Sequence, residues 1–277
     1  MTFDLSRDPR RLRLLLDADA IASIPHVAGD ITEPEALDRA LAEHEITQVI
    51  HLAALQVPFV RADPPLGARV NVVGFVNVFE AAKRHGLGSI VYASSIAALD
   101  LAGGMAGLPT TLYGAFKRAN EHCAHVYFAE DGIASIGLRP HIVYGVGRDQ
   151  GISSGPTAAM LAAAAGTGYR IPYGGACQLQ FARDVARAFV AAADASAEGA
   201  TVHNLPGRRT AIADVVAAIG SPAITFEDVR LPFPEEVDSA SFSASFPDVG
   251  QTPLEEGVRA TIERFRQLLA EGLVTAA

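Results

Sequence analysis

Short apolar runs alternate with longer helical segments through the first half of this chain, and this alternation limits the possible folds more than any other feature. The apolar runs lie at 25–28, 48–53, 89–95 and 134–140. Helical periodicity fills the intervals over 32–43, 66–85 and 112–130. Strands that are apolar on both faces and joined by helices are typical of a covered parallel sheet. The pattern predicts an α/β fold with a doubly wound parallel sheet.

The strand–helix rhythm breaks after Tyr144, where the chain becomes rich in glycine, serine and aromatic residues. In an α/β protein such segments are typically loops that bind substrate. A chain of 277 residues has room for one large or two small domains. We expect residues 1–145 to form the main domain and residues 146–277 mainly a smaller substrate-binding lobe. Segments near 176–204 are expected to return to the main sheet.

Composition excludes several classes of protein. Hydrophobic residues make up 49% of the chain and charged residues 19%, which is too apolar for global disorder. No apolar run approaches the length of a membrane-spanning helix, so we expect no membrane partner. The formal net charge of −9 argues against a nucleic-acid partner, because such a partner requires a basic face.

The N-terminus has no long apolar stretch followed by a cleavage site, so we expect a cytoplasmic protein rather than a secreted one. Cys123 and Cys177 form no Cys-x-x-Cys pair, which predicts reduced thiols and no metal site. The arginines near the N-terminus alternate with acidic residues and are interpreted as a solvated helix face. They are Arg7, Arg10, Arg11 and Arg13.

The most informative motif is Tyr113-Gly114-Ala115-Phe116-Lys117. Positions i and i+4 of a helix face the same way, so Tyr113 and Lys117 can share one small site. A neighbouring ammonium lowers the pKa of a tyrosine, because it stabilises the phenolate. A tyrosine in this state can act as a general acid or base on a hydroxyl or carbonyl. The alternative is a solvent-facing lysine beside a half-buried tyrosine.

A pair of hydroxyls precedes this motif at the end of an apolar strand. Ser94 and Ser95 close the run at 89–95, eighteen residues before Tyr113. Ligands of parallel sheets bind beyond the carboxyl ends of the strands. A serine at this position can therefore hydrogen-bond a substrate oxygen, and its combination with the tyrosine–lysine pair predicts a catalytic site.

Further motifs occur in order along the chain. They are Gly29-Asp30-Ile31, His51-Leu52-Ala53-Ala54, Asn71-Val72-Val73-Gly74, Leu138-Arg139-Pro140, Val143-Tyr144-Gly145, Arg183-Asp184-Val185-Ala186 and Thr252-Pro253-Leu254-Glu255. With these motifs the sequence resembles the extended short-chain dehydrogenase/reductase family, the NAD-dependent epimerase/dehydratase proteins, over nearly its whole length. The resemblance implies that residues 1–145 form a Rossmann-like domain that binds NAD.

The resemblance also implies a role for individual residues. Ser95, Tyr113 and Lys117 would be catalytic. An acidic Asp4 after the second strand would hold the adenosine ribose and favour NAD over NADP, although Asp4 could instead cap a loop. The residues implied to bind NAD are Asp4, Asp30, Ile31, Leu52, Ala53, Ala54, Asn71, Ala93, Ser94, Tyr113, Lys117, Pro140 and Val143. Those implied to bind substrate are Gln56, Ser95, Tyr113 and Arg148.

The sequence departs from the family at the glycine fingerprint Gly-x-x-Gly-x-x-Gly, which has no match. We therefore expect the first strand to be missing, which would leave the strands at 25–28 and 48–53 without an inner neighbour. The pyrophosphate of NAD would also lack its helix N-terminus. The alternative to an active enzyme is a start-truncated family member with little or no cofactor binding or catalysis.

Two other departures concern the substrate. The family arginine that clamps a nucleotide-sugar diphosphate is not matched in 176–184, and no Asp-Glu pair follows Ser95. Water elimination is therefore not expected, and a small sugar or polyol is favoured. The resemblance leaves an epimerase and a dehydrogenase open.

The resemblance further implies a homodimer in which the helices at 66–85 and 112–130 pair with their copies. The apolar residues expected at this contact are Val72, Val76, Phe79, Phe116 and Tyr127. The alternative is that these side chains face their own sheet.

Overall fold

The computed structural model of this chain describes residues 1–99, 108–231 and 234–275. The chain divides into two compact units. Unit 1 comprises Met1–Pro9, Ala18–Pro140 and Ala188–Leu205, and unit 2 comprises Arg10–Asp17, His141–Arg187 and Pro206–Ala277. The division between them follows Pro140, and three separate segments of the chain contribute to each unit.

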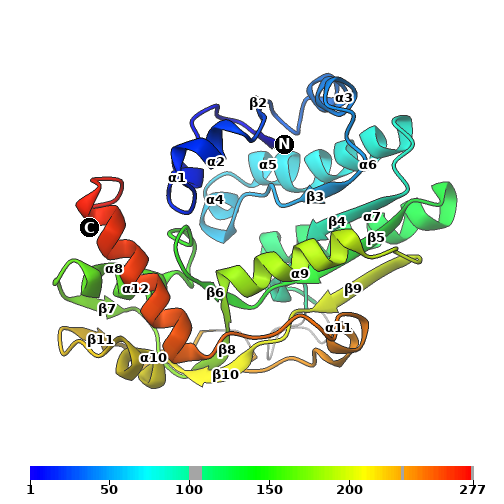
Figure 1. Cartoon of the computed structure of the whole chain (residues 1–277). Coiled ribbons are helices and arrows are strands. Elements are labelled where there is room, and N and C mark those ends of the chain that lie inside the picture. The colour runs from blue at the N-terminus through cyan, green and yellow to red at the C-terminus, as the bar shows by residue number, and fades with distance from the viewer. Residues whose placement is uncertain (100–107, 232–233, 276–277) are drawn as a thin grey trace. The chain divides into compact units, whose positions relative to one another are not determined.

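The main sheet of unit 1 is parallel and has the strand order β3-β4-β5-β9 (Figure 1). Its strands are β3 (Val49–His51), β4 (Ser89–Ala93), β5 (Ala134–Arg139) and β9 (Ala200–Asn204). The α/β fold with a parallel sheet that the sequence predicts is therefore confirmed. Only the last part of the segment expected to return, β9, lies in this sheet.

Two more parallel strands of unit 1 form a separate pair, β1 (Thr2–Asp4) with β2 (His26–Ala28). The expectation that the strand at 25–28 lacks its inner neighbour is wrong, because β2 is hydrogen-bonded to β1. Strand β3 pairs only with β4 among the described residues. Phe3 of β1 packs on the same apolar core as the main sheet, so the two sheets of unit 1 share one core.

The helices at Pro34–Glu43, Gly74–Arg84 and Leu112–Asp131 contribute side chains to this core, and β4 contributes Tyr92. The helical segments are α2 (Ala18–Ala22), α3 (Pro34–Glu43), α4 (Val57–Ala62), α5 (Pro64–Ala68), the π-helical turn η1 (Arg69–Val73), α6 (Gly74–Arg84), the short 3₁₀ helix η2 (Ile96–Ala98), α7 (Leu112–Asp131) and α9 (Ala182–Asp194), which begins in unit 2. Phe75 and Phe79 of α6 contact Tyr92 of β4 edge-on, and Phe79 stacks on Tyr127 of α7 at 4.9 Å.

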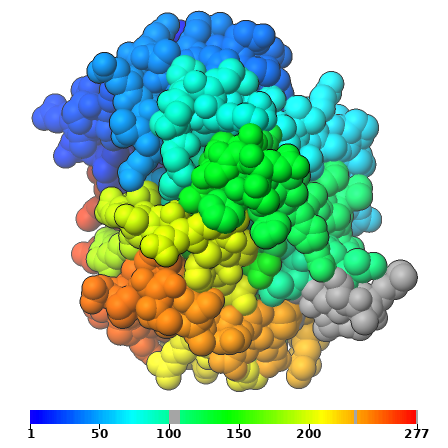
Figure 2. Space-filling view, turned by 90° about the vertical axis from the view of Figure 1, so that its right-hand side faces the viewer, coloured from blue at the N-terminus to red at the C-terminus, as the bar shows by residue number. Residues whose placement is uncertain are grey.

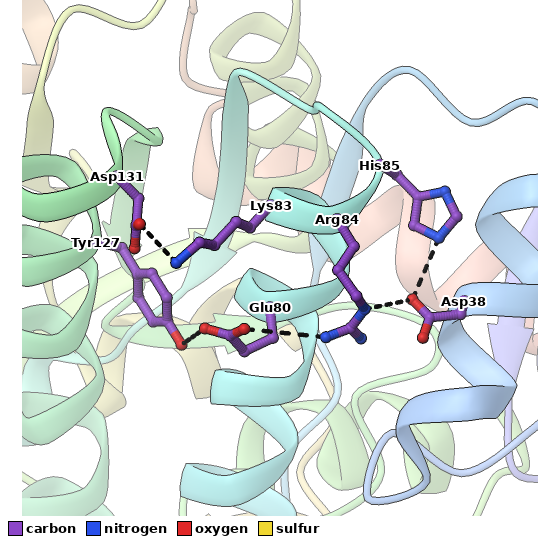
Figure 3. Close-up of polar contacts among 7 residues, drawn as sticks. All are labelled: Asp38, Glu80, Lys83, Arg84, His85, Tyr127 and Asp131. Atoms are coloured by element: carbon purple, nitrogen blue, oxygen red, sulfur yellow. Dashed lines mark hydrogen bonds and ion pairs between the residues drawn. The ribbon is translucent and has the colours of Figure 1, made fainter.

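A chain of polar contacts ties α6 to the helices on either side of it (Figure 3). Lys83 of α6 pairs with Asp131 of α7 at 2.6 Å, and the Tyr127 hydroxyl donates to Glu80 at 2.9 Å. On the other side, Arg84 pairs with Asp38 of α3 at 3.1 Å. Because these pairs are largely exposed, they orient the helices more than they stabilise them.

Unit 2 is built on a mixed three-stranded sheet with the order β10-β8-β6. These strands are β6 (Ile142–Tyr144), β8 (Ala176–Phe181) and β10 (Arg208–Ala211), and a parallel pair is formed by β7 (Tyr169–Ile171) and β11 (Ile224–Phe226). The helices are α1 (Arg10–Arg13), α8 (Gly155–Ala164), α10 (Ile212–Ile219), α11 (Ala240–Ser245) and α12 (Leu254–Ala270).

The start of the chain contributes to unit 2 in a way that the charge pattern did not indicate. Arg11 pairs with Asp149 at 3.1 Å, and Arg264 of α12 donates to the Leu14 carbonyl at 2.8 Å. Helix α1 is only four residues long, so the predicted solvated helix face is a single turn. The side chain of Arg11 is half exposed although it pairs with Asp149. In the part of the chain that the structure describes, no helix is long and apolar enough to cross a membrane.

Candidate active site

Tyr113 and Lys117 lie one turn apart in the first turns of α7, as their spacing predicts. Thr111 is the N-cap of this helix, and its hydroxyl accepts a hydrogen bond from the Gly114 backbone N–H at 3.0 Å. Such a cap satisfies a backbone donor that the helix leaves free. The Lys117 Nζ lies 5.8 Å from the centre of the Tyr113 ring, so the cation and the ring are neighbours.

Lys117 is buried, with only 3% of its surface exposed. Its Nζ donates to the Ala93 carbonyl at the end of β4, at 2.6 Å. Burial lowers the pKa of Lys117 from 10.5 to about 8, while the negative charge of Glu121 acts in the opposite direction. The positive charge of Lys117 in turn adds to burial in lowering the pKa of His51 to about 3. Near neutral pH the site therefore holds a charged lysine and a neutral histidine.

Ser95 follows β4 and is the N-cap of η2, where its Oγ accepts from the Ala97 N–H at 3.2 Å. Helix α7 approaches η2 very closely at Gly114, because a Cβ at this position would lie 2.1 Å from the Ala97 carbonyl oxygen. This approach brings the turn after Ser95 against the first turn of α7, which carries Tyr113. The three residues predicted to be catalytic are therefore held in one region of unit 1.

Asn71 lies in η1 and is 1% exposed. Its side-chain amide makes two hydrogen bonds to the backbone of Leu55, from Leu55 N–H to Oδ1 at 2.7 Å and from Nδ2 to the Leu55 carbonyl at 2.8 Å. Its own carbonyl accepts from Asn120 of α7 at 2.7 Å. Asn71 thus fixes the loop after β3 and joins it to α7.

A buried ion pair lies further along the same face of α7 and was not predicted from the sequence. Glu121 receives hydrogen bonds from Arg139 Nε at 2.7 Å and Arg139 Nη2 at 2.5 Å, and also from the Ser94 hydroxyl. Asn204 of β9 lies 3.4 Å from Arg139 Nη1. The spacing Tyr113, Lys117, Glu121 continues the i, i+4 pattern and was the available signal.

The residues expected to hold the adenosine half of NAD follow strands β1, β2 and β3. Asp4 ends β1 with an exposed side chain, and Asp30 accepts a hydrogen bond from the Thr32 N–H through Oδ1 at 2.8 Å. Ile31 packs against Gly74, where a Cβ would lie 2.6 Å from its Cδ1. Leu52 leaves 59% of its surface exposed after β3, although it is a large apolar residue.

These features fit the adenosine half of the cofactor. An apolar side chain exposed beyond a parallel strand, with acidic side chains after two other strands of the same unit, suits an adenine and its ribose. Ala53 is exposed beside Leu52, whereas Ala54 is partly covered. Ala93 is the last residue of β4 and Ser94 follows it, while Pro140 follows the last residue of β5.

The remaining predicted residues fall into both units. Gln56 is the N-cap of α4 in unit 1. Val143 lies in β6 of unit 2, and Arg148 is held in the same unit by the Gln150 carbonyl and by Ser153 Oγ at 3.3 Å. Among residues 1–99, 108–231 and 234–275, no three His, Cys, Asp or Glu side chains gather as a metal site requires.

The family arginine that clamps a diphosphate has no match at its expected position in the segment from 176 to 184, although Arg183 lies in that segment. The two glutamines of the segment are used internally. Gln178 donates to the Val237 carbonyl at 3.0 Å and accepts from the Val237 N–H at 3.2 Å. Gln180 accepts from the His141 N–H at 2.8 Å and donates to the Pro206 carbonyl at 3.1 Å. These glutamines thus connect loops of unit 2 to β8.

The parallel α/β sheet, with the tyrosine–lysine pair of α7 beside the end of β4, is the arrangement that the sequence resemblance implies. The family model for the NAD dependent epimerase/dehydratase family matches residues 5–205, and the chain belongs to this family. NAD is the cofactor of the family, in agreement with the sequence-based expectation.

Proteins similar to this chain include epimerases and dehydrogenases. UDP-glucuronate 4-epimerase 4 of Arabidopsis thaliana is 34% identical over 145 residues, which are 49% of this chain and 32% of that protein. The match therefore spans about a third of the relative's length. The crystal structure of Thermus thermophilus UDP-glucose 4-epimerase with NAD is 25% identical, with a TM-score of 0.71 over 88% of this chain and 85% of that one. A monomeric L-threonine 3-dehydrogenase from a metagenome, 19% identical, shares the fold with a TM-score of 0.82 over 96% of this chain and 90% of that one.

Proposed function

We propose that this protein is an NAD-dependent enzyme that oxidises the hydroxyl group of a sugar or sugar-like substrate, with Ser95, Tyr113 and Lys117 as its catalytic residues. The observation that carries the proposal is the burial of the Lys117 ammonium against Tyr113. A buried positive charge stabilises an adjacent phenolate, because little water screens the attraction.

In this proposal each residue has one task. Tyr113 takes the proton of the substrate hydroxyl as a general base, and Lys117 stabilises the phenolate that makes this possible. Ser95 hydrogen-bonds the same substrate oxygen and orients it toward Tyr113. NAD, when bound, accepts a hydride from the carbon that bears the hydroxyl. Asp4, Asp30 and Leu52 hold the adenosine end, and Ala93 and Pro140 border the nicotinamide.

The fate of the oxidised substrate decides between two activities. If the site keeps the ketone and lets it turn, return of the hydride gives an epimer; if it releases the ketone, the enzyme is a dehydrogenase. Relatives of both kinds exist, as the names UDP-glucuronate 4-epimerase and L-threonine 3-dehydrogenase state. The internal use of Gln178 and Gln180 supports a substrate without a nucleotide diphosphate.

The experiment is a substrate panel with NAD supplied to the purified chain. The panel contains UDP-glucose, UDP-glucuronate, free hexoses and polyols, and L-threonine. Formation of reduced nicotinamide reports a dehydrogenase, and product analysis by NMR reports an epimer. We expect turnover of a free sugar or polyol. Turnover of L-threonine alone would contradict the proposed substrate class while leaving the proposed site intact.

A calorimetric titration of NAD separates an active enzyme from a family member that does not bind the cofactor. Micromolar binding supports the proposal. Absence of heat at millimolar NAD would favour the alternative of a family member with idle catalytic residues.

We also propose a cytoplasmic location, because Cys123 and Cys177 are free thiols in the structure. Fractionation of the native cell tests that part.

A further inference from the structure

Glu121 has an unusually complete set of partners for a carboxylate within a helix. It is 8% exposed and receives two hydrogen bonds from the Arg139 guanidinium and one from the Ser94 hydroxyl. A buried carboxylate requires such partners, because removal of its water shell is costly. Replacement of the ion pair by apolar residues would cost little stability, so its presence calls for another reason.

The position of Glu121 relative to Lys117 suggests that reason. Both side chains extend from α7 to the end of β4, where Lys117 binds the Ala93 carbonyl and Glu121 binds the hydroxyl of the next residue, Ser94. The Ser94 N–H in turn donates to the Leu138 carbonyl of β5 at 2.8 Å. Two consecutive residues of the strand end are thus tied to two consecutive turns of the helix.

We propose that Glu121, paired with Arg139, is a positioning residue that locks the end of β4 against α7 and holds Lys117 in the charge state that Tyr113 requires. The catalytic part of this inference rests on the proposed function, whereas the electrostatic part concerns the folded protein alone. Ser95 follows the residue that Glu121 holds, so the lock also fixes the distance between the proposed serine and tyrosine.

The charges around Lys117 come from each element packed there. On α7 they are Tyr113 and Glu121, and β3 contributes His51. Arg139 of β5 pairs with Glu121. The cations of α4 and η1, Arg61 and Arg69, are exposed. Among the residues that the structure describes, Glu121 is the carboxylate whose charge acts on Lys117, and it raises the pKa of Lys117 against the effect of burial.

The two members of the ion pair should act on Lys117 in opposite directions. Glu121→Gln keeps the shape and an acceptor for Ser94 but removes the negative charge, so the pKa of Lys117 falls. Arg139→Gln removes the positive charge and leaves the carboxylate of Glu121 unpaired, so the pKa of Lys117 rises. A merely structural ion pair would give no such opposition, because loss of either partner would only loosen the fold.

The sequence makes a direct measurement possible, since Lys83 and Lys117 are the two lysines of the chain. Lysine labelled with ¹³C at Cε gives two NMR signals, and Lys83→Arg assigns them. Their titration curves are recorded without NAD or substrate in the wild type, in both variants, and in a control, Glu130→Gln, which removes an exposed carboxylate from the same helix.

We expect the pKa of Lys117 to fall by about one unit in Glu121→Gln and to rise by a similar amount in Arg139→Gln, with the control within about 0.2 unit of the wild type. Shifts in the same direction, or no shift in Glu121→Gln, would overturn the proposal. If Arg139→Gln does not fold, Glu121→Gln with its control decides alone. Because no turnover is measured, failure of the proposed function would leave this result unaffected.

The claim that Glu121 positions the end of β4 is tested by a separate measurement. Ser94→Ala removes the hydrogen bond to Glu121 but no charge, so we expect the pKa of Lys117 to stay unchanged. With the substrate found in the panel, we expect a lower kcat and a nearly unchanged KM. Glu121→Gln should in addition shift the alkaline limb of the pH–rate profile to lower pH, because Lys117 loses its proton earlier. A profile with an unmoved alkaline limb would contradict the assignment.

Discussion

At the scale of single residues, the site places a charged amine where the fold would be more stable without one. Lys117 is buried with one carbonyl partner described, and its pKa is lowered to about 8. The shift from 10.5 means that the folded protein holds the lysine proton less tightly than the unfolded chain does. Below pH 8 Lys117 is charged in the folded state, and the free-energy cost of burying this charge fully reduces the stability of the fold.

This penalty has a measurable dependence on pH. Between about pH 8 and pH 10.5 the unfolded chain binds more protons at this group, so the contribution of Lys117 to stability rises with pH. Lys117→Met lacks this contribution. We expect the free energy of unfolding of the wild type, relative to Lys117→Met, to increase by about 2 kcal/mol from pH 7 to pH 10. Urea titrations of both proteins check this, and a constant difference would contradict the lowered pKa.

Asp4 provides the residue-scale prediction for the cofactor. Its carboxylate is exposed after β1 and would accept hydrogen bonds from the adenosine ribose of NAD but repel the 2′-phosphate of NADP. Asp4→Ala should reduce the preference for NAD by about tenfold, since a charged hydrogen bond contributes about 1.5–3 kcal/mol. The two dissociation constants are measured by fluorescence titration.

The matched control for this variant is Asp8→Ala, which removes the same charge from the same exposed segment. It should leave the NAD-to-NADP ratio unchanged. Equal effects of the two substitutions would mean that only general charge matters, and tighter binding of NADP by the wild type would show that Asp4 is misassigned.

The sequence could predict the tyrosine–lysine pair because both residues belong to one helix, where spacing alone decides which side chains are neighbours. Glu121 has the same spacing, but its importance depends on Arg139 of β5 and Ser94 of β4, which only the fold brings to it. Long-range partners of this kind leave no periodic trace. For the same reason the contacts of Asn71 with Leu55 and Asn120 could not be predicted from the sequence.

At the scale of elements, the close approach of α7 to η2 is the contact that holds the site together. Gly114 allows this approach, because its missing Cβ would overlap the Ala97 carbonyl. Gly114→Ala should lower the free energy of unfolding by about 1–3 kcal/mol, despite the better helix propensity of alanine. It should also reduce turnover, because Ser95 and Tyr113 flank the contact.

Gly88→Ala is the control for Gly114→Ala, since nothing lies within 4 Å of a Cβ at position 88. Equilibrium unfolding and turnover are measured for both variants. If Gly114→Ala is as stable and active as Gly88→Ala, the packing of α7 on η2 is not what positions the site.

Helix boundaries show where local sequence rules are insufficient. Thr32 and Thr252 each precede a glutamate by three residues, which is typical of a capping box. The helices instead begin at Pro34 and Leu254, and neither threonine is the N-cap. Thr252 is used by a distant partner, because its N–H and hydroxyl both bind the Asp184 carboxylate, at 2.6 and 2.8 Å. A tertiary hydrogen bond has replaced the local cap.

At the scale of the whole molecule, the parallel sheet was predictable because buried strands leave continuous apolar runs in the sequence. Which segments of the chain belong to which unit could not be predicted. Residues 10–17 contribute to unit 2 through Arg11 and Arg264, and β8 pairs with β10 and β6 rather than with the main sheet. Both facts depend on contacts between segments far apart in sequence. Composition and periodicity describe only the local chain.

The expected homodimer remains a proposal, and the structure changes the residues that would carry it. Phe79 is fully buried and stacks on Tyr127, so these two belong to the protein's own core. On the face drawn in Figure 2, the surfaces of α6, in cyan, and the end of α7, in green, adjoin. The apolar side chains exposed on η1 and α7 are Val73, Leu112, Val126 and Phe128.

We expect light scattering to give twice the 29.0 kDa mass of the chain at micromolar concentration. Val126→Glu should shift the protein to the monomer, because a charge at a symmetric contact faces its own copy. Val229→Glu in unit 2 is the control, since Val229 is similarly exposed but lies outside these helices. A 29.0 kDa wild-type particle would contradict the dimer.

The central claim is that Tyr113 carries the proton during hydride transfer between a substrate carbon and NAD. The most direct test uses the substrate found in the panel, deuterated at the carbon that bears the hydroxyl, with the wild type and Tyr113→Phe at saturating NAD. Tyr169→Phe serves as the control, because it removes a hydroxyl in unit 2. We predict that the wild type and the control pass deuterium to the nicotinamide or return it to the epimerised carbon, while Tyr113→Phe is slower by about 10²–10⁴-fold with an unchanged melting temperature. Deuterium transfer by Tyr113→Phe within a few-fold of the wild-type rate would contradict the account.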